Sequence, residues 1–133
     1  MSDETEFYRA MVLAGNYGYI NTELKIKHQS EPGSYLFLDN VGQRGDTLFV
    51  FEGKAGKSEK AFLQLRTAYL SLNDPFYKRT SIYGHLFENY SKIRLFYYSF
   101  NRGLLIEYNT KIAELQQYKF RDINELSIIL RNL

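Results

Sequence analysis

Three residues near the middle of the chain have side chains suited to the hydrolysis of a phosphodiester bond. Asp39, Glu52 and Lys54 supply two carboxylates and one ammonium group. Hydrolysis of this kind needs carboxylates that hold a divalent ion beside the scissile phosphate, and a cation that orients or activates the attacking water. Glu52 and Lys54 alternate along an expected strand and therefore share a face, and a hairpin can bring Asp39 towards them. We expect these residues to form one catalytic site.

The position of Glu52 and Lys54 at the end of an apolar run adds weight to this expectation. Both residues follow the sequence LFVF at residues 48–51, and burial of an unpaired charge is costly. The alternative is an ordinary glutamate and lysine at the solvent end of a strand, since so short a triplet recurs often by chance.

The elements that must position these residues follow from apolar periodicity and capping signals. Three helices are expected: residues 3–14 between Ser2 and Gly15, residues 58–72 capped by Ser58, and a last helix that starts at the Asp122–Glu125 capping box and ends at Leu133. Five strands are expected at residues 22–28, 35–39, 47–54, 92–100 and 104–108, with residues 40–46 joining the second to the third. This order, α-β-β-β-α-β-β-α, predicts an α/β fold with a mixed central β-sheet flanked by helices.

Several short sequences in this order are similar to those of a known family. They are LFLD ending at Asp39, the twelve residues between Asp39 and Glu52, LFVFEGK at residues 48–54, and AFLQLRTAY in the expected second helix. Over residues 3–109 the chain resembles the PD-(D/E)xK nucleases. Two branches look similar: archaeal Holliday junction resolvases, by the spacing between the first acid and ExK, and type II restriction endonucleases, by the QL-containing helix and the strand pair KIRLFYYSFNRGLLIEY.

The resemblance implies a restriction-endonuclease-like core and a role for each matching residue. Asp39 and Glu52 would bind Mg²⁺, for which Mn²⁺ would substitute, and Lys54 would position the nucleophilic water. Gln64 corresponds to a glutamine in the helix after the motif, with an exposed helix-surface amide as the alternative. Glu6 corresponds to an acid that some members place near the metal, although a charge in a helix's first turn has its own favourable dipole interaction.

The chain departs from the family pattern at the first acidic position. Asp39 is not preceded by proline, and Asp46 and Glu31 are competing candidates for the first carboxylate. Asp46 lies beside Gly45, which is typical of a turn residue. The identity of the first acidic ligand therefore stays open at the level of sequence.

Basic residues next to the expected site are candidates for DNA binding. Residues 54–66 contain four basic residues and a single acid, Glu59, and this excess of positive charge favours docking of phosphate there. The basic residues are Lys54, Lys57, Lys60 and Arg66. Basic and aromatic residues also alternate later in the chain, where the aromatic side chains are candidates either for base stacking or for the core: Tyr77, Lys78, Arg79, Tyr83, Tyr90, Lys92, Arg94, Tyr97, Tyr98 and Arg102.

Composition limits the remaining possibilities. The chain has 133 residues, a net charge of +2 and no cysteine, so we expect one domain over residues 1–133, or one domain of a longer enzyme, without thiol chemistry or thiolate zinc sites. No signal peptide and no apolar run of roughly 20 residues is apparent, and we expect a soluble cytoplasmic protein. The sequence GKAGKS at residues 53–58 partly matches a phosphate-binding P-loop, but Phe51 stands where the first glycine belongs.

The expected activity is that of a magnesium-dependent DNA endonuclease, restriction-endonuclease-like, that acts as a homodimer because two strands must be cut. A Holliday junction resolvase is the alternative within the same chemistry. A non-catalytic module that binds nucleic acid or protein on the nuclease fold is the alternative from another class.

Overall fold

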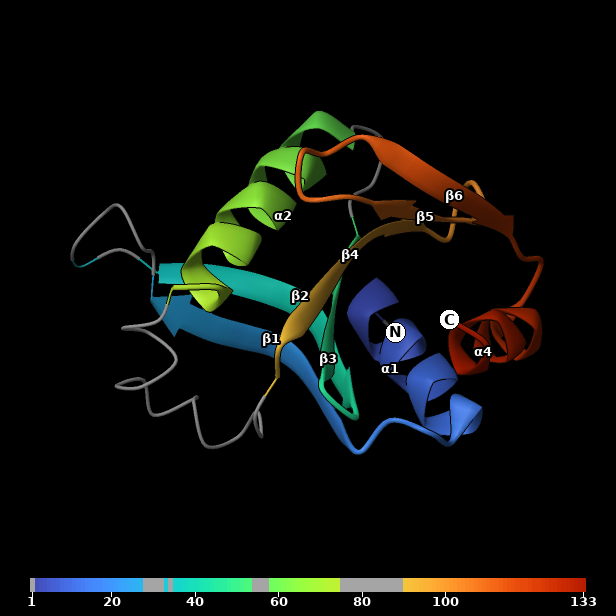
Figure 1. Cartoon of the computed structure of the whole chain (residues 1–133). Coiled ribbons are helices and arrows are strands. Elements are labelled where there is room, and N and C mark those ends of the chain that lie inside the picture. The colour runs from blue at the N-terminus through green and yellow to red at the C-terminus, as the bar shows by residue number, and fades with distance from the viewer. Residues whose placement is uncertain (1, 28–32, 34, 54–57, 75–89) are drawn as a thin grey trace.

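The computed structural model describes residues 2–27, 33, 35–53, 58–74 and 90–133. One mixed six-stranded sheet runs through the molecule in the order β1-β2-β3-β4-β5-β6 (Figure 1). The strands are β1 (Tyr19–Lys27), β2 (Tyr35–Arg44), β3 (Thr47–Gly53), β4 (Lys92–Ser99), β5 (Leu104–Tyr108) and β6 (Glu114–Lys119). Among these six strands only β3 and β4 pair in parallel, and α2 (Ser58–Leu72) between them contributes to the crossover that a parallel pair requires.

Three helices of the described part of the chain cover the sheet: α1 (Asp3–Ala14), α2 (Ser58–Leu72) and α4 (Ile123–Arg131). The Ser2 side chain accepts a hydrogen bond from the Thr5 amide at the start of α1, and Gly15 ends this helix at a φ of 80°. At α4, Asp122 accepts a hydrogen bond from the Glu125 amide at 2.9 Å. These caps explain why the sequence predicts the starts of both helices.

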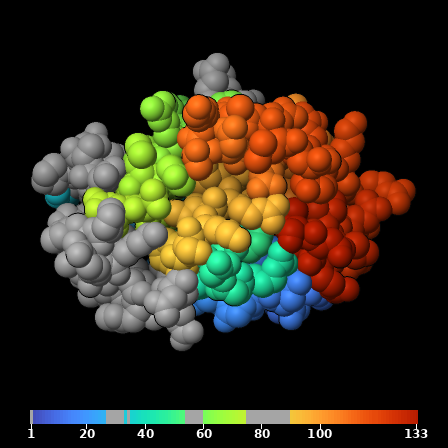
Figure 2. All heavy atoms as spheres, in the orientation of Figure 1, coloured from blue at the N-terminus to red at the C-terminus, as the bar shows by residue number. Residues whose placement is uncertain are grey.

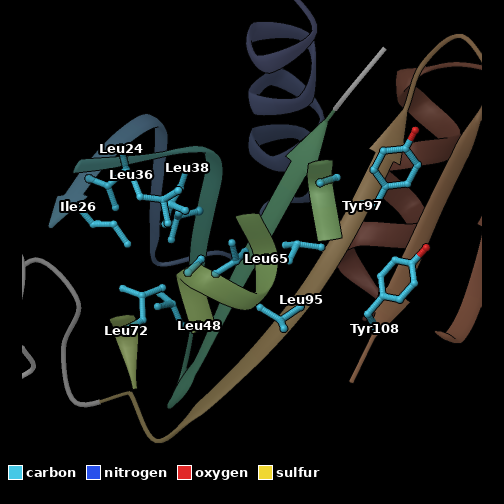
Figure 3. Close-up of a cluster of buried hydrophobic side chains, with 14 of the residues drawn as sticks. Leu24, Ile26, Leu36, Leu38, Leu48, Leu65, Leu72, Leu95, Tyr97 and Tyr108 are labelled. Atoms are coloured by element: carbon cyan, nitrogen blue, oxygen red, sulfur yellow. The ribbon is translucent and has the colours of Figure 1, made fainter. Parts of the chain in front are cut away.

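The sheet has a separate hydrophobic core on each face. On one face α2 packs Ala61, Leu65, Ala68 and Leu72 against leucines, valines and tyrosines of the strands (Figure 3). On the other face α1 and α4 lie side by side and enclose an aromatic core with Phe49, Phe51, Phe96 and Tyr98. Figure 2 shows the C-terminal elements, coloured orange to red, on the surface at the right of the molecule.

The second strand is longer than the sequence predicts. Residues 40–44 continue β2, and only the turn at Gly45 and Asp46 separates it from β3. Val41 and Gly42 pair with Val50 and Phe49, and all four are buried, so this segment completes the sheet instead of forming a loop.

Other boundaries also differ from the predicted ones. β1 starts at Tyr19, three residues before the predicted Thr22, β4 ends at Ser99, and α4 ends at Arg131. The predicted element order lacked β6, a strand with mostly exposed residues that pairs with β5 at the sheet edge. The coarse α/β class with a mixed sheet is confirmed.

Among the residues that the structure describes, no helix has the length and apolar character that crossing a membrane requires.

Candidate functional site

The candidate site lies where β2 and β3 stop pairing through their backbones. The last paired residues are Asn40 and Phe51, and beyond them side chains provide the hydrogen bonds. The Asp39 amide donates to Oε1 of Glu52 at 3.1 Å, and the Gly53 amide donates to Oδ2 of Asp39 at 2.8 Å. Each carboxylate therefore binds the backbone of the other strand, which holds Asp39 and Glu52 beside each other.

The two carboxylates differ in their access to solvent. Glu52 follows Leu48 and Val50 at alternate positions on the face that α2 covers, and it is 0% exposed. Asp39 is half-buried. A fully buried carboxylate is costly unless opposite charge or hydrogen bonds compensate, and the hydrogen bond from the Asp39 amide contributes to that compensation at Glu52.

A tyrosine, an asparagine and a glycine support the carboxylate pair from the α1 side of the sheet. The Tyr98 ring packs directly on Gly53, where an added Cβ would lie 2.5 Å from the ring. The Tyr98 hydroxyl donates to Oδ1 of Asn40 at 2.8 Å, and Nδ2 of Asn40 donates to the Glu4 carbonyl at 3.0 Å. These contacts tie the start of α1 to the strand ends that carry Asp39 and Glu52.

Negative charge concentrates around the Tyr98 phenol. Burial raises the pKa of Tyr98 far above its usual value, and the carboxylates of Asp39, Glu4, Glu52 and Asp3 raise the pKa further, in that order of effect. Carboxylates from α1, β2 and β3 therefore act on one region of the molecule. Such a region favours a bound cation.

The other predicted site residues lie on the two helices or outside the described residues. Gln64 on α2 is partly buried, and its Oε1 is buried with no hydrogen-bond partner among the residues that the structure describes. Lys60 and Arg66 are exposed on the same helix. Lys54 and Lys57 fall outside the described ranges.

Glu6 and the two competing acids are in different places. Glu6 forms an ion pair with Arg9 along α1 at 3.3 Å. Asp46 lies at the opposite end of β3 from Glu52, where the Ser91 hydroxyl donates to it and lowers the pKa of its carboxyl. Glu31 lies outside the described residues.

In the described part of the later run of basic and aromatic residues, the tyrosines belong to the core, whereas Tyr77, Lys78, Arg79 and Tyr83 lie outside the described residues. Tyr90, Tyr97 and Tyr98 are buried. Arg94 forms a bidentate ion pair with Glu107, with both hydrogen bonds at 2.7 Å. These side chains are therefore engaged within the protein and do not present a stacking surface.

The carboxylate pair has the donor chemistry that magnesium prefers. Magnesium is commonly held by one or two carboxylates together with water and substrate phosphates. No group of three or more His, Cys, Asp or Glu side chains suited to a metal occurs in the described ranges, so a site at Asp39 and Glu52 would rely on water and phosphate oxygens for its remaining ligands. With that addition the two residues fit a magnesium ion.

Sequence reasoning names Asp39 and Glu52 as candidates, but it does not indicate the contacts of Asn40, Gly53 and Tyr98 beside them. An asparagine directly after Asp39 and a glycine directly after Glu52 were the available signals. The scan against protein-family models, the search of curated proteins and the search of solved structures each found no match. The assignment of this site therefore rests on the contacts of this chain alone.

Proposed function

We propose that the chain is a metal-dependent DNA endonuclease with a PD-(D/E)xK site on a restriction-endonuclease-like core. The observation that carries the proposal is the reciprocal bonding of Asp39 and Glu52, each to a backbone amide of the neighbouring strand. Hydrogen bonds from amides favour the ionised form of a carboxylate. Two carboxylates held beside each other in this way can share a divalent cation.

Each residue has a defined part in the proposed reaction. Asp39 and Glu52 would hold Mg²⁺, which supplies Lewis-acid stabilisation of the phosphate and a more acidic bound water. The water oxygen would attack phosphorus and lose a proton to solvent, while the bond from phosphorus to the leaving oxygen breaks in line with the attack and that oxygen takes up a proton. Lys54, two residues after Glu52, would orient the attacking water, and Gln64 would donate its amide to the substrate or to that water.

Basic residues before and along α2 would bind the DNA backbone. Lys57, Lys60 and Arg66 follow the proposed site directly in sequence, and Lys60 and Arg66 are exposed. Contacts of this kind position DNA and weaken as salt concentration rises. Replacing Lys60 or Arg66 with glutamine should therefore raise KM and reduce the dependence of binding on salt, while the fold remains intact.

The decisive experiment is a cleavage assay with duplex DNA, single-stranded DNA and a four-way junction in Mg²⁺, Mn²⁺ or chelator. We expect metal-dependent cutting by the wild type, and its loss in Lys54→Ala and Glu52→Gln. Glu114→Gln, at an exposed carboxylate on β6, is the matched control and should cut normally. Cutting that survives in chelator or in both site variants would contradict the proposal.

The pattern of substrates separates the alternatives. Cutting confined to the four-way junction would identify a junction resolvase. No cutting of any substrate by a folded wild type would instead favour a non-catalytic binding module.

We also propose a homodimer as the active form, since a symmetric pair of sites can cut both strands. Sedimentation of the protein alone and on DNA tests this, and a monomer in both states would exclude it.

A further inference from the structure

The strand β1 forms one edge of the sheet (Figure 1). Among the described strands its neighbour is β2 alone, in antiparallel pairing. An edge strand leaves the N–H and C=O groups of alternate residues outside the ladder of hydrogen bonds. Residues 20–22, near the start of β1, are all partly exposed. The backbone of this stretch is therefore available for pairing with another extended chain.

A hollow of about 380 Å³ lies between this stretch of β1 and the helix α1. It is open to solvent, and its lining residues come from both elements: Thr5, Tyr8, Ile20, Asn21 and Thr22. A volume of this size lies within the range of roughly 300–1,000 Å³ that is typical of ligand sites. The hollow can therefore accept a large side chain from a partner molecule.

Asn21 lines the hollow through its backbone. It pairs with Val41, which packs in the core beneath α2, and directly paired residues of antiparallel strands share a face. The Asn21 amide group donates to the Tyr19 hydroxyl at 2.9 Å, and Tyr19 packs against the same α2 core. Ile20, by contrast, packs against the core on the α1 side. The hollow thus borders the edge backbone of β1 as well as side chains.

The end of the hollow near Thr22 is acidic. The Asn40 side chain donates both to the Glu4 carbonyl and to the Thr22 hydroxyl, which places the start of α1 beside Thr22. Glu4 precedes Tyr8 by one helical turn, and the exposed Glu23 follows Thr22 directly on β1. Two carboxylates therefore lie near the same end of the hollow and favour a positively charged group over phosphate.

Two basic side chains of the same elements are engaged within the chain. Arg9 on α1 forms an ion pair with Glu6 at 3.3 Å, and Nζ of Lys25 on β1 lies 4.0 Å from the centre of the Tyr35 ring. Towards the other end of the hollow, Val12 on α1 is 51% exposed and adds apolar surface. The groove between α1 and β1 thus passes from an acidic end to an apolar end.

We propose that the groove between α1 and β1 binds an extended peptide of a partner protein as an additional strand. Residues 20–22 supply main-chain hydrogen bonds, and the hollow accepts an apolar side chain of the peptide against Tyr8 and Ile20. A lysine or arginine of the peptide lies at the acidic end, near Glu4 and Glu23. Glu23 has a φ of 55°, which interrupts regular pairing, so the added strand is short. This inference does not depend on the proposed nuclease activity.

A phage-displayed library of random short peptides, selected on the folded full chain, provides the probes. Enriched peptides should carry lysine or arginine together with an apolar residue. In fluorescence anisotropy of the synthetic peptides, Thr5→Trp, which fills the hollow, and Tyr8→Ala, which removes its aromatic wall, should each weaken binding by about fivefold or more. Both residues are exposed, so the fold should survive. Tyr35→Ala, at a tyrosine that is 55% exposed on β2, is the matched control and should bind normally.

Two further measurements test strand addition itself. N-methylation of the peptide at alternate residues, whose amides face β1, should weaken binding by about 2- to 10-fold for each lost hydrogen bond. Methylation at the residues between them should not. Binding should also slow hydrogen exchange at outward-facing amides of residues 20–22 and leave exchange in β6 unchanged.

Four results would overturn the inference: no enriched peptide, enrichment of acidic peptides, binding that survives both Thr5→Trp and Tyr8→Ala, or N-methylation without effect at every position. A dimer in sedimentation that Thr5→Trp dissociates would also overturn it, because the groove would then belong to a second copy of the chain. These measurements use neither DNA nor metal, so their failure and the failure of the cleavage assay are separate outcomes.

Discussion

The carboxylates of Asp39 and Glu52 serve the backbone and the proposed chemistry at the same time. Their oxygens satisfy the amides of Gly53 and Asp39 at the point where β2 and β3 separate, so removal of either side chain leaves a backbone donor without its bond. Substitution by the amide keeps shape but offers an acceptor on only one side. Glu52→Gln should therefore disturb the local structure far less than Glu52→Ala, and it is the better test of catalysis.

Gly53 is a position where one added methyl group should disturb the contacts that orient Asp39. An added Cβ would lie 2.5 Å from two atoms of the Tyr98 ring, so ring and strand must move apart. Gly53→Ala should lower the free energy of unfolding by about 1–3 kcal/mol, measured by urea denaturation, and should also reduce cleavage because the Gly53 amide orients Asp39.

Gly18→Ala is the matched control for Gly53→Ala. The nearest atom to an added Cβ at Gly18 is the Gln43 carbonyl oxygen at 3.9 Å, an ordinary contact. Gly18→Ala should thus change stability by less than about 0.5 kcal/mol. Equal stability of the two variants would contradict the close packing of Tyr98 on Gly53.

Tyr98 should contribute to the loss of stability at alkaline pH. Burial and the nearby carboxylates raise its pKa in the folded protein, whereas an unfolded tyrosine ionises near about pH 10. A raised folded pKa gives stability that is fully present below the unfolded pKa and is lost as pH rises above it. Each such group adds a slope of about 1.4 kcal/mol per pH unit in that range.

Tyr98→Phe removes this ionisable group. The free energy of unfolding should therefore fall less steeply with pH in the alkaline range, by the slope of one such group. The substitution also removes the hydrogen bond to Asn40, so the variant should be about 1 kcal/mol less stable at neutral pH. Urea denaturation at a series of pH values measures both effects. Parallel alkaline limbs for wild type and variant would show that Tyr98 ionises normally in the folded protein.

At the scale of elements, a local irregularity in β1 lies next to the proposed site. Glu23 has a φ of 55°, which is unfavourable for a residue with a side chain. Its neighbours Thr22 and Leu24 pair with Asn40 and Leu38, so Glu23 lies opposite Asp39. Leu38 points to the α2 core while Asn40 bonds to α1, which shows that β2 changes its facing at Asp39.

Glu23→Gly should therefore stabilise the protein. Glycine adopts positive φ without steric cost, and this gain should exceed its entropic cost by about 0.5–1 kcal/mol. Glu114→Gly, at an exposed residue of β6 that does not have positive φ, should be destabilising by a similar amount. Thermal unfolding of the two variants measures both, and destabilisation by Glu23→Gly would show that the irregularity is not strained.

The elements that the sequence predicts well are those with a cap or one buried face. Ser2 and Gly15 set the limits of α1, and the apolar stripe of α2 predicts residues 58–72 correctly. β6, with the sequence ELQQYK, has no buried face at the sheet edge and so no alternating pattern to find. The glycines at residues 42 and 45 suggested a loop, but Gly42 is buried in β2 because Met11 and Tyr17 occupy the space of a side chain.

The candidate site likewise contains residues that the sequence predicts and contacts that it does not. Charges that end an apolar run are visible in the sequence, and they indicate Asp39 and Glu52. The partnership of Asn40 with Tyr98 joins residues 58 positions apart, and it depends on the parallel pairing of β3 with β4. No local sequence pattern predicts such a contact, so the hydrogen bond between Tyr98 and Asn40 could be found only from the fold.

At the scale of the whole molecule, the last residues of the chain bind the sheet and α1 together. The Tyr17 hydroxyl donates to the Leu130 carbonyl at 2.8 Å, and Arg131 donates to the Ala14 carbonyl at 2.9 Å. The carbonyls that α4 leaves unpaired at its end are thus bound by side chains from other elements. The α1–α4 layer is stabilised at this end, and the same α1 reaches the candidate site through Glu4 at its start.

Arg44 makes the most extensive of these contacts and should be important for docking of α4. It donates to the carbonyls of Leu130, Arg131 and Leu133, and its guanidinium lies 5.3 Å from the centre of the Tyr17 ring. Arg44→Met keeps much of the apolar stem but loses every one of these hydrogen bonds. We expect a loss of about 2 kcal/mol in the free energy of unfolding.

The loss should be concentrated in α4, because the hydrogen bonds of Arg44 reach the final turn of that helix and the residues after it. Hydrogen exchange should accelerate at the amides of α4 in Arg44→Met, while amides in β3 and β4 change only as far as global stability does. Arg102→Met, at an exposed arginine in the β4–β5 turn, is the control and should leave both unchanged. Uniform acceleration throughout the sheet would mean that α4 does not open separately and that the molecule unfolds as one cooperative unit.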